Sequence, residues 1–478
     1  MTTAISAESR IALDPRASFE RLRANTPAMA RTTAAERRQR LARLGAAIEA
    51  RRGAIAAAIH ADLARPAFET EVAETQHAIS EIGYARKHLH QWMKGERVGG
   101  SMLLAGTSQR IHYEPRGVVL IIAPWNYPFE LLIGPLIAAV AAGNCALVKP
   151  SEKSPHVAAL VGGLIAEVFD PSEVACATGG PDVSAALLDL PFDHICFTGS
   201  TAIGKKVMAA AAQNLATVTL ELGGKSPAIV DQTADIHAAA DRIAWGKFYN
   251  AGQTCIAVDY VLVHASRERE LLDALEVSVA RFFGATEEAR AQSPDLARII
   301  DEGHFQRIQS LVARSLEAGA RALTGARYDR TTKYVAPTIL SGVTRDMPIM
   351  QEEIFGPVLP VLSVGSADDA AQFVRAGDKP LAMYIFAQRA VADRLIAETS
   401  SGATVVGGTL LHYASHTVPF GGVGASGQGS YHGVHGFRAF SHARAIVRQR
   451  EPAISRFMFP PYRGKMHEWM RKLLRVIG

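Results

Sequence analysis

Residues 117–149 read GVVLIIAPWNYPFELLIGPLIAAVAAGNCALVK, and this stretch decides the fold class. The continuous apolar run at 118–122 predicts a strand that is buried on both faces, as in a parallel sheet. An apolar helix is expected over 129–143, and a second apolar strand follows at 145–148. A strand, a helix and a strand in this order are typical of an α/β domain with a parallel sheet.

The same alternation continues along the chain. Further strands are expected near 174–177, at 194–197 and at 218–222, with helices between them. This pattern predicts a doubly wound α/β domain. A second series of strands and helices runs from 227 to 363 and predicts a second doubly wound α/β domain. Before residue 117, a capping-box sequence from Thr33 to Glu36 predicts the start of a long helix.

Composition sets the broad class. A chain of 478 residues exceeds what one hydrophobic core usually supports, and 48% apolar with 20% charged residues is ordinary for a soluble globular protein. The longest apolar stretch, 129–142, is too short to span a bilayer. The first residues, MTTAISAESRIALDPR, lack the apolar segment of a secretory signal, so we expect a cytoplasmic location.

The net charge of +5 comes from the end of the chain, where residues 444–478 hold nine Lys or Arg and two acidic residues. The rest is slightly acidic, so the charge gives no reason to expect nucleic acid. The tail also has an apolar stripe at helical spacing, formed by Met466, Trp469, Met470, Leu473 and Ile477. Such a basic amphipathic helix either packs on its own protein or a partner subunit, or contacts an anionic membrane surface.

Three turns at the ends of predicted strands have the chemistry of a nucleotide site. Residues 149–152, KPSE, offer a cation and a carboxylate to ribose hydroxyls, and 199–204, GSTAIG, open a helix as a phosphate cradle does. Gly179 and Gly180 would allow close backbone approach. The segment 422–427, GVGASG, matches a dinucleotide fingerprint by its letters, but no strand precedes it and the residues after it make a poor helix. We interpret it as a glycine-rich loop.

The chain has four cysteines, none in a CxxC pair, so neither a disulfide framework nor a zinc site is expected. Cys145, Cys176 and Cys196 lie in apolar stretches, where a thiol behaves as a small hydrophobe. Cys255 differs because it follows a polar, glycine-rich stretch in YNAGQTCIAVDYV, residues 249–261. By itself this setting fits a structural cysteine as well as a nucleophile.

Other motifs favour the nucleophile. Taken in order, PWNYP, KPSE, FTGS, LELGGKSP, GQTC, EEIFGPV and PFGGVGASG resemble the aldehyde dehydrogenase superfamily over about residues 30–445. The wording around the cysteine is similar to the class 3 branch, most of all to coniferyl-aldehyde-dehydrogenase-like proteins. The resemblance implies NAD(P)-dependent oxidation of an aldehyde to the carboxylic acid, with NAD favoured and NADP possible.

The resemblance also implies roles for individual residues. Cys255 would be the nucleophile, Glu221 would activate the hydrolytic water, and Asn126 would help to form the oxyanion hole. The residues expected to bind the cofactor are Trp125, Lys149, Ser151, Glu152, Gly180, Gly199, Ser200, Gly204, Leu222, Gly223, Glu353 and Phe355. Those expected to contact the substrate are Tyr127, Tyr249, Thr254, Ile256 and Tyr413. Their aromatic rings suggest aromatic or medium-to-long aliphatic aldehydes, although each ring could equally be core packing.

The family's organisation implies an NAD(P)-binding domain at 1–96 and 117–219, a catalytic domain at 220–405 and a basic tail at 441–478. A bridging arm at 97–116 and 406–440 implies a homodimer. The chain departs from relatives at Gly407 and Gly408, where they carry Asn and Asp, and this removes side chains near the expected substrate mouth. Two other functions remain open: a CoA-acylating dehydrogenase, which should not need Glu221, and a non-catalytic structural relative, which would be expected to lose Cys255 or Glu221.

Overall fold

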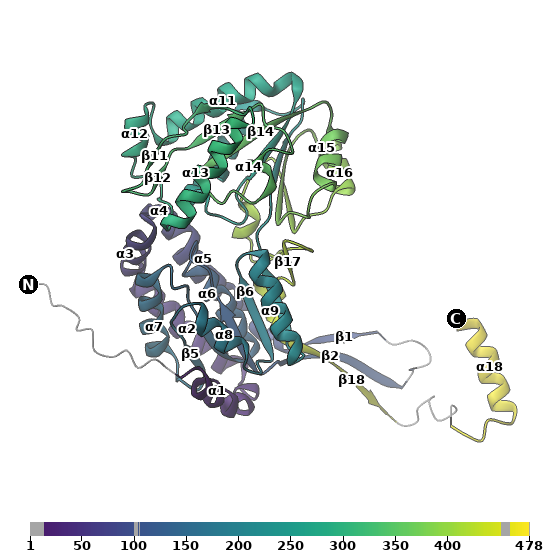
Figure 1. The fold of residues 1–478 in the computed structure, drawn as a ribbon. Coiled ribbons are helices and arrows are strands. Elements are labelled where there is room, and N and C mark those ends of the chain that lie inside the picture. Colours follow the sequence, from purple (N-terminus) through teal and green to yellow (C-terminus); the bar gives the residue numbers. More distant parts are fainter. Residues whose placement is uncertain (1–13, 100–103, 105, 451–458, 478) are drawn as a thin grey trace, which may run out of the picture.

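The computed structural model describes residues 14–99, 104, 106–450 and 459–477. Two lobes are stacked one above the other, and a narrow β arm projects from the lower lobe (Figure 1). Strongly apolar sequences form the sheets at the centre of each lobe, because strands covered by helices on both faces must bury both sets of side chains.

The lower lobe contains a six-stranded sheet in the order β17-β7-β6-β3-β4-β5. All neighbours pair in parallel except β17, which is antiparallel to β7. The strands are β3 (Val118–Ile122), β4 (Cys145–Lys149), β5 (Val174–Cys176), β6 (His194–Thr198), β7 (Thr217–Glu221) and β17 (Gly427–Gln428). The chain direction across the sheet reverses at β3 and β6, so the loops after these two strands open a crevice.

Helices cover both faces of this sheet (Figure 1). They are α1 (Pro15–Ala30), α2 (Ala34–Ala50), α3 (Arg52–Leu63), α4 (Ala67–Thr70), the π-helical turn η1 (Glu71–Thr75), α5 (Gln76–Met93), α6 (Glu130–Ala142), α7 (Pro155–Val168), α8 (Pro181–Leu188), α9 (Thr201–Gln213) and α17 (Gly433–Ala439). The capping box expected at Thr33 is confirmed, since the backbone N–H of Thr33 donates to the Glu36 carboxylate at 2.7 Å.

The upper lobe contains a seven-stranded sheet in the order β10-β13-β14-β9-β8-β15-β16, parallel except for the β10–β13 pair. Its strands are β8 (Pro227–Val230), β9 (Tyr260–His264), β10 (Arg321–Thr324), β13 (Thr338–Ser341), β14 (Val358–Val364), β15 (Ala382–Phe386) and β16 (Ala403–Val406). Beside it lies a small ribbon of β11 (Tyr328–Asp329) and β12 (Tyr334–Val335).

Each helix of the upper lobe begins after a turn that contains polar residues or proline. They are α10 (Ile236–Phe248), α11 (Glu268–Phe283), α12 (Glu287–Ala291), α13 (Glu302–Glu317), α14 (Pro348–Gln351), α15 (Ala367–Arg375) and α16 (Arg389–Glu398), with 3-10 turns η3 (Tyr249–Gly252), η4 (Ala265–Arg267) and η5 (Leu411–Ala414). Two doubly wound α/β units are therefore present, and the fold class expected from the sequence is confirmed.

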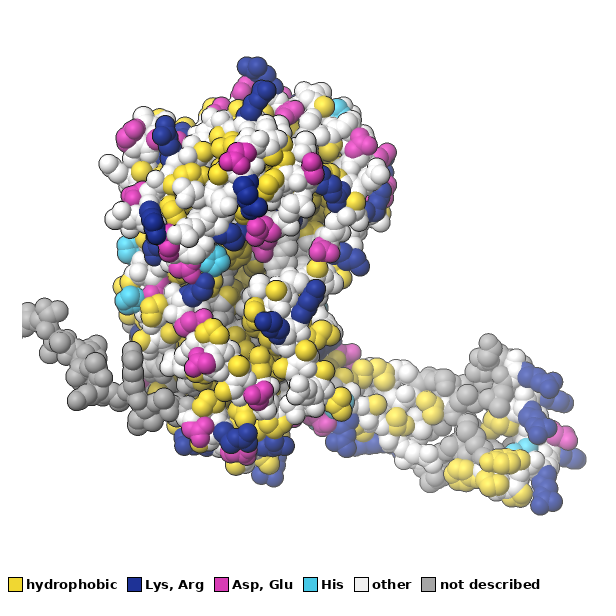
Figure 2. All heavy atoms as spheres, viewed as in Figure 1, with side chains coloured by type: hydrophobic (Ala, Val, Ile, Leu, Met, Phe, Trp, Pro, Cys, Tyr) yellow, Lys and Arg dark blue, Asp and Glu magenta, His cyan; other side chains and the backbone are white. Residues whose placement is uncertain are grey.

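The arm is a three-stranded antiparallel sheet of β1 (Glu96–Val98), β2 (Thr107–Pro115) and β18 (Ser441–Gln449). β18 lies in the stretch where the sequence had suggested only a tail, because its residues are mostly exposed and lack the alternation that marks a half-buried strand. The chain ends in α18 (Lys465–Ile477), whose lysines and arginines stand out in Figure 2. Within the expected apolar stripe, the side chains of Met466, Leu473 and Ile477 fall outside the described residues. Among the helices that the structure describes, none is long and apolar enough to cross a membrane.

Candidate active site

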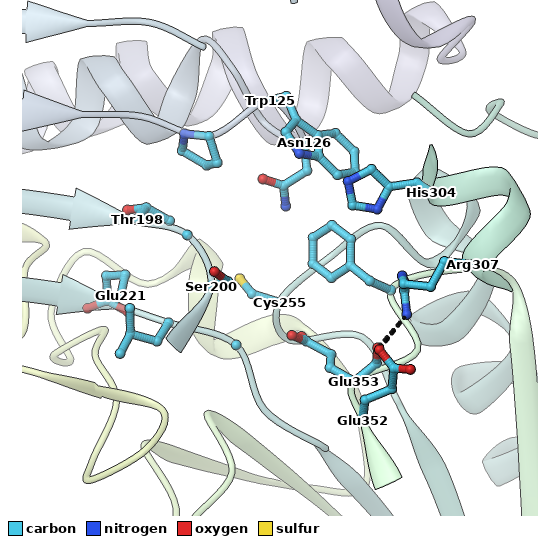
Figure 3. A pocket seen from close by; sticks show the side chains of 15 residues that line it. Trp125, Asn126, Thr198, Ser200, Glu221, Cys255, His304, Arg307, Glu352 and Glu353 are labelled. Carbon is cyan, nitrogen blue, oxygen red and sulfur yellow. Dashed lines mark hydrogen bonds and ion pairs between the residues drawn. The ribbon is translucent and has the colours of Figure 1, made fainter. Parts of the chain in front are cut away.

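A cavity of about 300 Å³ lies between the two lobes, where the surface is hollowed (Figures 2 and 3). It is lined by Pro124, Trp125, Asn126, Thr198, Gly199, Ser200, Glu221, Leu222, Gly223, Cys255, His304, Arg307, Glu352, Glu353 and Phe355. The loops after β3, β6 and β7 supply its lower wall, as the carboxyl ends of parallel strands do in open α/β sheets. The upper lobe supplies the rest.

A second, more apolar cavity of about 220 Å³ lies on the other side of Cys255. Its walls are Val72, Ala73, His77, Tyr127, Leu131, Trp245, Tyr249, Thr254, Cys255, Ile256, Leu410, Leu411, Tyr413 and Ala414. Cys255 lines both cavities, so a molecule in either one can reach its sulfur.

The loop that carries Cys255 is held by its own polar residues. Asn250, Ala251 and Gly252 all have positive φ, and a side chain on Gly252 would collide with the carbonyl of Gly356. Gln253 is fully buried and its amide donates to the carbonyls of Asn250 at 3.1 Å and of Arg298 at 3.0 Å. Residues 250–253, the polar stretch before Cys255, therefore fix the conformation of the loop that carries it.

The surroundings of the Cys255 thiol favour its protonated form. Burial raises its pKa, and the carboxylates of Glu353 and Glu221 raise it further. The backbone N–H groups of Cys255 and Ile256 act in the opposite direction. A thiol in this state needs a base, or the removal of a neighbouring negative charge, to become a nucleophile.

Glu221 ends β7 and is buried beneath the cavity. Neither of its carboxylate oxygens has a hydrogen-bond partner among the described residues, and burial raises its pKa well above the usual value. A buried, unpartnered carboxylate is costly to the fold. Such a group is suited to accept a proton from water or a thiol bound beside it.

Asn126 follows β3 and its Nδ2 donates to the Gln253 carbonyl at 3.0 Å, beside Cys255. The carbonyl of Asn126 accepts from Asn250 Nδ2 at 3.0 Å and from the guanidinium of Arg65. Arg65 is fully buried and was missed by the sequence analysis. It also binds the Glu74 carboxylate and donates to Asn250 Oδ1 at 3.0 Å, so one arginine ties the loops of Asn126 and Cys255 together.

On the far side of the larger cavity, Ser200 caps α9, and its Oγ accepts from the backbone N–H of Ile203 at 3.4 Å. The start of this helix faces the cavity and suits an anion. A side chain on Gly223 would collide with the Glu353 carboxylate, so the glycine keeps the space that Glu353 reaches into. Burial, together with the charge of Asp259, raises the pKa of Glu353 to about 8. Gly204 packs against Leu222, which a side chain there would displace.

Five residues expected to bind the cofactor do not line this cavity: Gly204, described above, and Lys149, Ser151, Glu152 and Gly180. Lys149 is buried, with its Nζ 3.1 Å from the Glu152 carboxylate and 3.2 Å from the Pro150 carbonyl. Ser151 lies in the same turn, and Gly180 precedes α8. These groups come from the ends of β4 and β5, next to β3 in the sheet. Three groups are spread along this edge of the sheet: the turn at 149–152, the start of α9, and the space that Glu353 reaches into. Their spread fits an extended dinucleotide better than a small ligand.

The upper wall also contains residues that the sequence analysis missed. Arg307, on α13, donates to the carbonyls of Glu353 at 3.1 Å and Ile354 at 2.6 Å. It also forms an ion pair of 3.3 Å with Glu352 (Figure 3). The ring of His304 lies 4.9 Å from that of Trp125. Helix periodicity alone gave no signal that this end of α13 faces a ligand.

The smaller cavity contains all five residues expected to contact a substrate. Tyr127 and Thr254 share a hydrogen bond of 2.8 Å, and Tyr413 stacks on His77 with ring centroids 4.6 Å apart. Trp245, Leu410 and Leu411 complete the wall and had not been expected. Gly407 has a φ of +70° and open space around it, whereas a Cβ on Gly408 would lie 3.0 Å from Leu411, which belongs to this wall.

Within the described residues, no group of three or more His, Cys, Asp or Glu side chains is arranged to hold a metal ion.

Comparisons with known proteins agree with this geometry. The family model described as the aldehyde dehydrogenase family matches residues 12–446. The 4,4'-diaponeurosporen-aldehyde dehydrogenase of Staphylococcus aureus (strain NCTC 8325 / PS 47) is 44% identical over 430 residues, 90% of this chain and 92% of that protein. The dimeric NADP-preferring aldehyde dehydrogenase of Mus musculus is 44% identical over 415 residues, 86% of this chain and 90% of its own. The structure of the substrate-bound state of Staphylococcus aureus AldH superimposes with a TM-score of 0.92 at 40% identity, covering 96% of this chain and 99% of that one.

Proposed function

Because this chain belongs to the aldehyde dehydrogenase family, in its class 3-like branch, and is an NAD(P)-dependent oxidoreductase, we propose that it acts through a covalent intermediate on Cys255. The substrate is an aromatic or medium-to-long aliphatic aldehyde, and the product is the carboxylic acid. One observation carries the proposal: Cys255 is the residue where an apolar cavity meets a cavity suited to a dinucleotide, and the unpartnered Glu221 lines the second of these cavities.

The first step is attack of the Cys255 sulfur on the aldehyde carbon, which forms an S–C bond and places negative charge on the carbonyl oxygen. Asn126 Nδ2 and the backbone N–H of Cys255 are the donors available to this oxygen. Donors of this kind are each worth about 3 kcal/mol in the transition state. When NAD or NADP is bound, its nicotinamide supplies the hydride acceptor that turns the adduct into a thioester.

Glu221 then takes a proton from water as the water oxygen attacks the thioester carbon. The C–S bond breaks, the acid leaves, and the sulfur regains a proton or stays as the thiolate. The empty hydrogen-bonding capacity of Glu221 supports this role, because both of its oxygens are free to accept from the water. A CoA-acylating enzyme would replace this water by a thiol and would have no use for Glu221.

Cofactor binding is assigned by position. Ser200 and the start of α9 would hold the pyrophosphate, Lys149 and Glu152 would bind the adenosine ribose, Glu353 would bind the nicotinamide ribose, and Phe355 would support the nicotinamide ring together with Trp125. Their ring centroids lie 5.4 Å apart, edge to face. Gly199, Gly204, Leu222, Gly223, Ser151 and Gly180 shape the backbone around these groups.

The smaller cavity supports an apolar substrate. Tyr127, Tyr249 and Tyr413 present rings, and Ile256 and Leu410 present aliphatic groups around Cys255. A planar aromatic aldehyde, including one of the coniferyl type, or an extended alkyl chain would bury its apolar surface there.

We assign a homodimer built on the arm of β1, β2 and β18. The dimeric relative supports this assembly, and so does the exposed edge of β1, which carries unpaired backbone groups.

The test is NADH formation by the purified protein, without CoA, from benzaldehyde, coniferyl aldehyde and a series of straight-chain aldehydes. We expect turnover that is lost in Cys255→Ala and retained in the matched control Cys176→Ala, whose thiol lies away from both cavities. Turnover that survives in Cys255→Ala would contradict the assignment, and turnover only with CoA would favour the acylating reaction.

A further inference from the structure

Another cavity, of about 250 Å³, borders on Trp245 and Tyr249, and the reaction described above makes no use of it. We call it the outer cavity. It is lined by Pro66, Phe68, Glu69, Trp245, Tyr249, Phe282, Phe283 and Asp295. Trp245 and Tyr249 also line the smaller cavity that contains Cys255, so the two cavities adjoin at this pair of rings. The ring centroids of the pair lie 5.7 Å apart, edge to face.

Aromatic rings make up most of the wall, since five of the eight lining residues are Phe, Tyr or Trp. Phe68 is 75% exposed and Trp245 is 40% exposed, so a ligand from solvent can reach both rings. The guanidinium of Arg281 already lies 5.0 Å from the centre of the Phe282 ring, and Asp241 neutralises that arginine. The face of an aromatic ring carries partial negative charge, so a wall of this kind attracts cations.

Two carboxylates, those of Glu69 and Asp295, stand among these rings, and among the described residues no cationic side chain lines the cavity. Within the part of the chain that the structure describes, neither carboxylate forms an ion pair. Glu69 is fixed in place, because its Oε2 accepts from the backbone N–H of Asn250 at 3.0 Å and its carbonyl accepts from the Tyr249 hydroxyl at 3.0 Å. The cavity therefore holds negative charge that no cation in its wall balances.

Two helices end at the outer cavity. Trp245 lies in the last turn of α10, and Phe282 and Phe283 are the last two residues of α11. The free carbonyl groups at the C-terminus of a helix carry partial negative charge, which stabilises a cation placed nearby. The rings, the carboxylates and the helix ends all favour a ligand with positive charge.

We propose that the outer cavity binds an organic cation, a group of the alkylammonium or quaternary ammonium type. Its volume suits a small organic group, and a divalent metal ion fits poorly because it needs six or more oxygen ligands, which a largely aromatic wall does not supply. An anion would be repelled by both carboxylates. Two sources would supply the cation: the far end of an aldehyde whose reacting end lies in the smaller cavity, or a separate amine. The cavity itself does not depend on the proposed function, whereas its use by an aldehyde does.

Packing alone does not account for this wall. Single exposed apolar side chains are ordinary on a protein surface, but rings gathered around a cavity with two carboxylates are not. Burial raises the pKa of Glu69 to about 7, and the charge of Arg65 opposes this shift. Arg65 does not line the cavity, and its guanidinium is bound by Glu74. A cation in the outer cavity would lie beside a carboxylate that the fold leaves partly unbalanced.

The test is saturation-transfer NMR on the full-length protein with choline and with 3,3-dimethyl-1-butanol, which has the same shape without the charge. We expect choline to bind about 10-fold more tightly than the alcohol. Glu69→Gln keeps an acceptor for the Asn250 N–H but removes the charge, and should weaken choline binding about fivefold. Phe68→Leu removes an exposed ring and should have a similar effect. The matched control Asp273→Asn, which removes a charge from α11 outside the cavity, should bind as the wild type does.

The pH dependence separates this site from simple apolar binding. The groups that face Glu69 are Arg65, Asp295, Tyr249 and the N–H of Asn250. Because a cation binds the ionised carboxylate better, choline affinity should rise from about pH 6 to about pH 8 in the wild type and stay level in Glu69→Gln. The affinity of the uncharged alcohol should not change with pH in either protein.

Equal affinities for choline and the alcohol would overturn the proposal, and so would a preference for choline that survives in both Glu69→Gln and Phe68→Leu. If Glu69→Gln does not fold, Phe68→Leu decides, because its side chain is mostly exposed. Choline added to the NADH assay then identifies the source. A higher KM for an aldehyde with a trimethylammonium group at its far end, with that for benzaldehyde unchanged, assigns the site to the substrate. An unchanged KM for both assigns it to a separate amine. Absence of NADH formation would contradict the proposed function and leave the NMR result standing.

Discussion

Substitution of Arg65 by Lys is expected to lower kcat/KM for aldehyde oxidation by about 100-fold although Arg65 touches neither cavity. The buried guanidinium holds the carbonyl of Asn126, the side chain of Asn250 and the carboxylate of Glu74 at once. It also lies 4.5 Å from the centre of the Tyr127 ring. Lysine keeps the positive charge but cannot present a planar fork to three acceptors.

The expected loss in kcat/KM follows from the loss of the Asn126 side chain as a hydrogen-bond donor. If Asn126 no longer points at the oxyanion, one donor worth about 3 kcal/mol is lost, which corresponds to roughly 100-fold in rate. Arg65→Met would in addition leave Glu74 buried without a cation. Breaking a buried ion pair in this way costs about 3–5 kcal/mol of folding free energy. The lysine variant therefore separates the loss of positioning from a loss of stability.

A double-mutant cycle with Asn126→Ala gives the decisive comparison. We expect each single variant to lose about 100-fold in kcat/KM and the double variant to lose little more than Asn126→Ala alone. Thermal unfolding should show that Arg65→Lys remains folded under the assay conditions. If the two losses multiply in the double variant, Arg65 does not act through Asn126 and the reasoning is refuted.

Two further predictions concern the cofactor side. Because the Glu353 carboxylate raises the pKa of the Cys255 thiol, Glu353→Gln should lower that pKa. Alkylation by iodoacetamide without cofactor should then begin at a lower pH, and an unchanged midpoint would contradict an electrostatic effect of Glu353 on the thiol. Glu152→Ala should raise the ratio of kcat/KM for NADP to that for NAD about fivefold. The substitution removes a negative charge, worth roughly 1 kcal/mol, beside the expected 2′-phosphate and releases Lys149 from its ion pair. An unchanged ratio would mean that the ribose binds elsewhere.

Much of the site could be predicted because chemistry at strand ends is local in sequence. Asn126, Ser200 and Glu221 each follow an apolar strand, and a parallel sheet gathers such ends at one edge. The position of each strand, read from a short apolar run, predicts that these residues lie at one edge of the sheet, and the family resemblance implies their roles.

Other parts had no local signal. Arg65 lies 61 residues before Asn126, and nothing in the sequence around it pairs the two. Arg307 and His304 reach the cavity from α13 because of how the lobes are stacked, which helical periodicity does not specify. The role of Gln253 as a brace depends on left-handed backbone at Asn250 and Ala251, a conformation that alanine rarely adopts.

The central claim is that Cys255 carries the acyl group and Glu221 removes it. The most direct measurement is peptide mass spectrometry of Glu221→Gln after one rapid mixing with aldehyde and NAD. We predict one equivalent of NADH per site, very slow further turnover, and an acyl group on the peptide that contains Cys255. An NADH burst followed by normal turnover, or an acyl group on any other residue, would contradict the account.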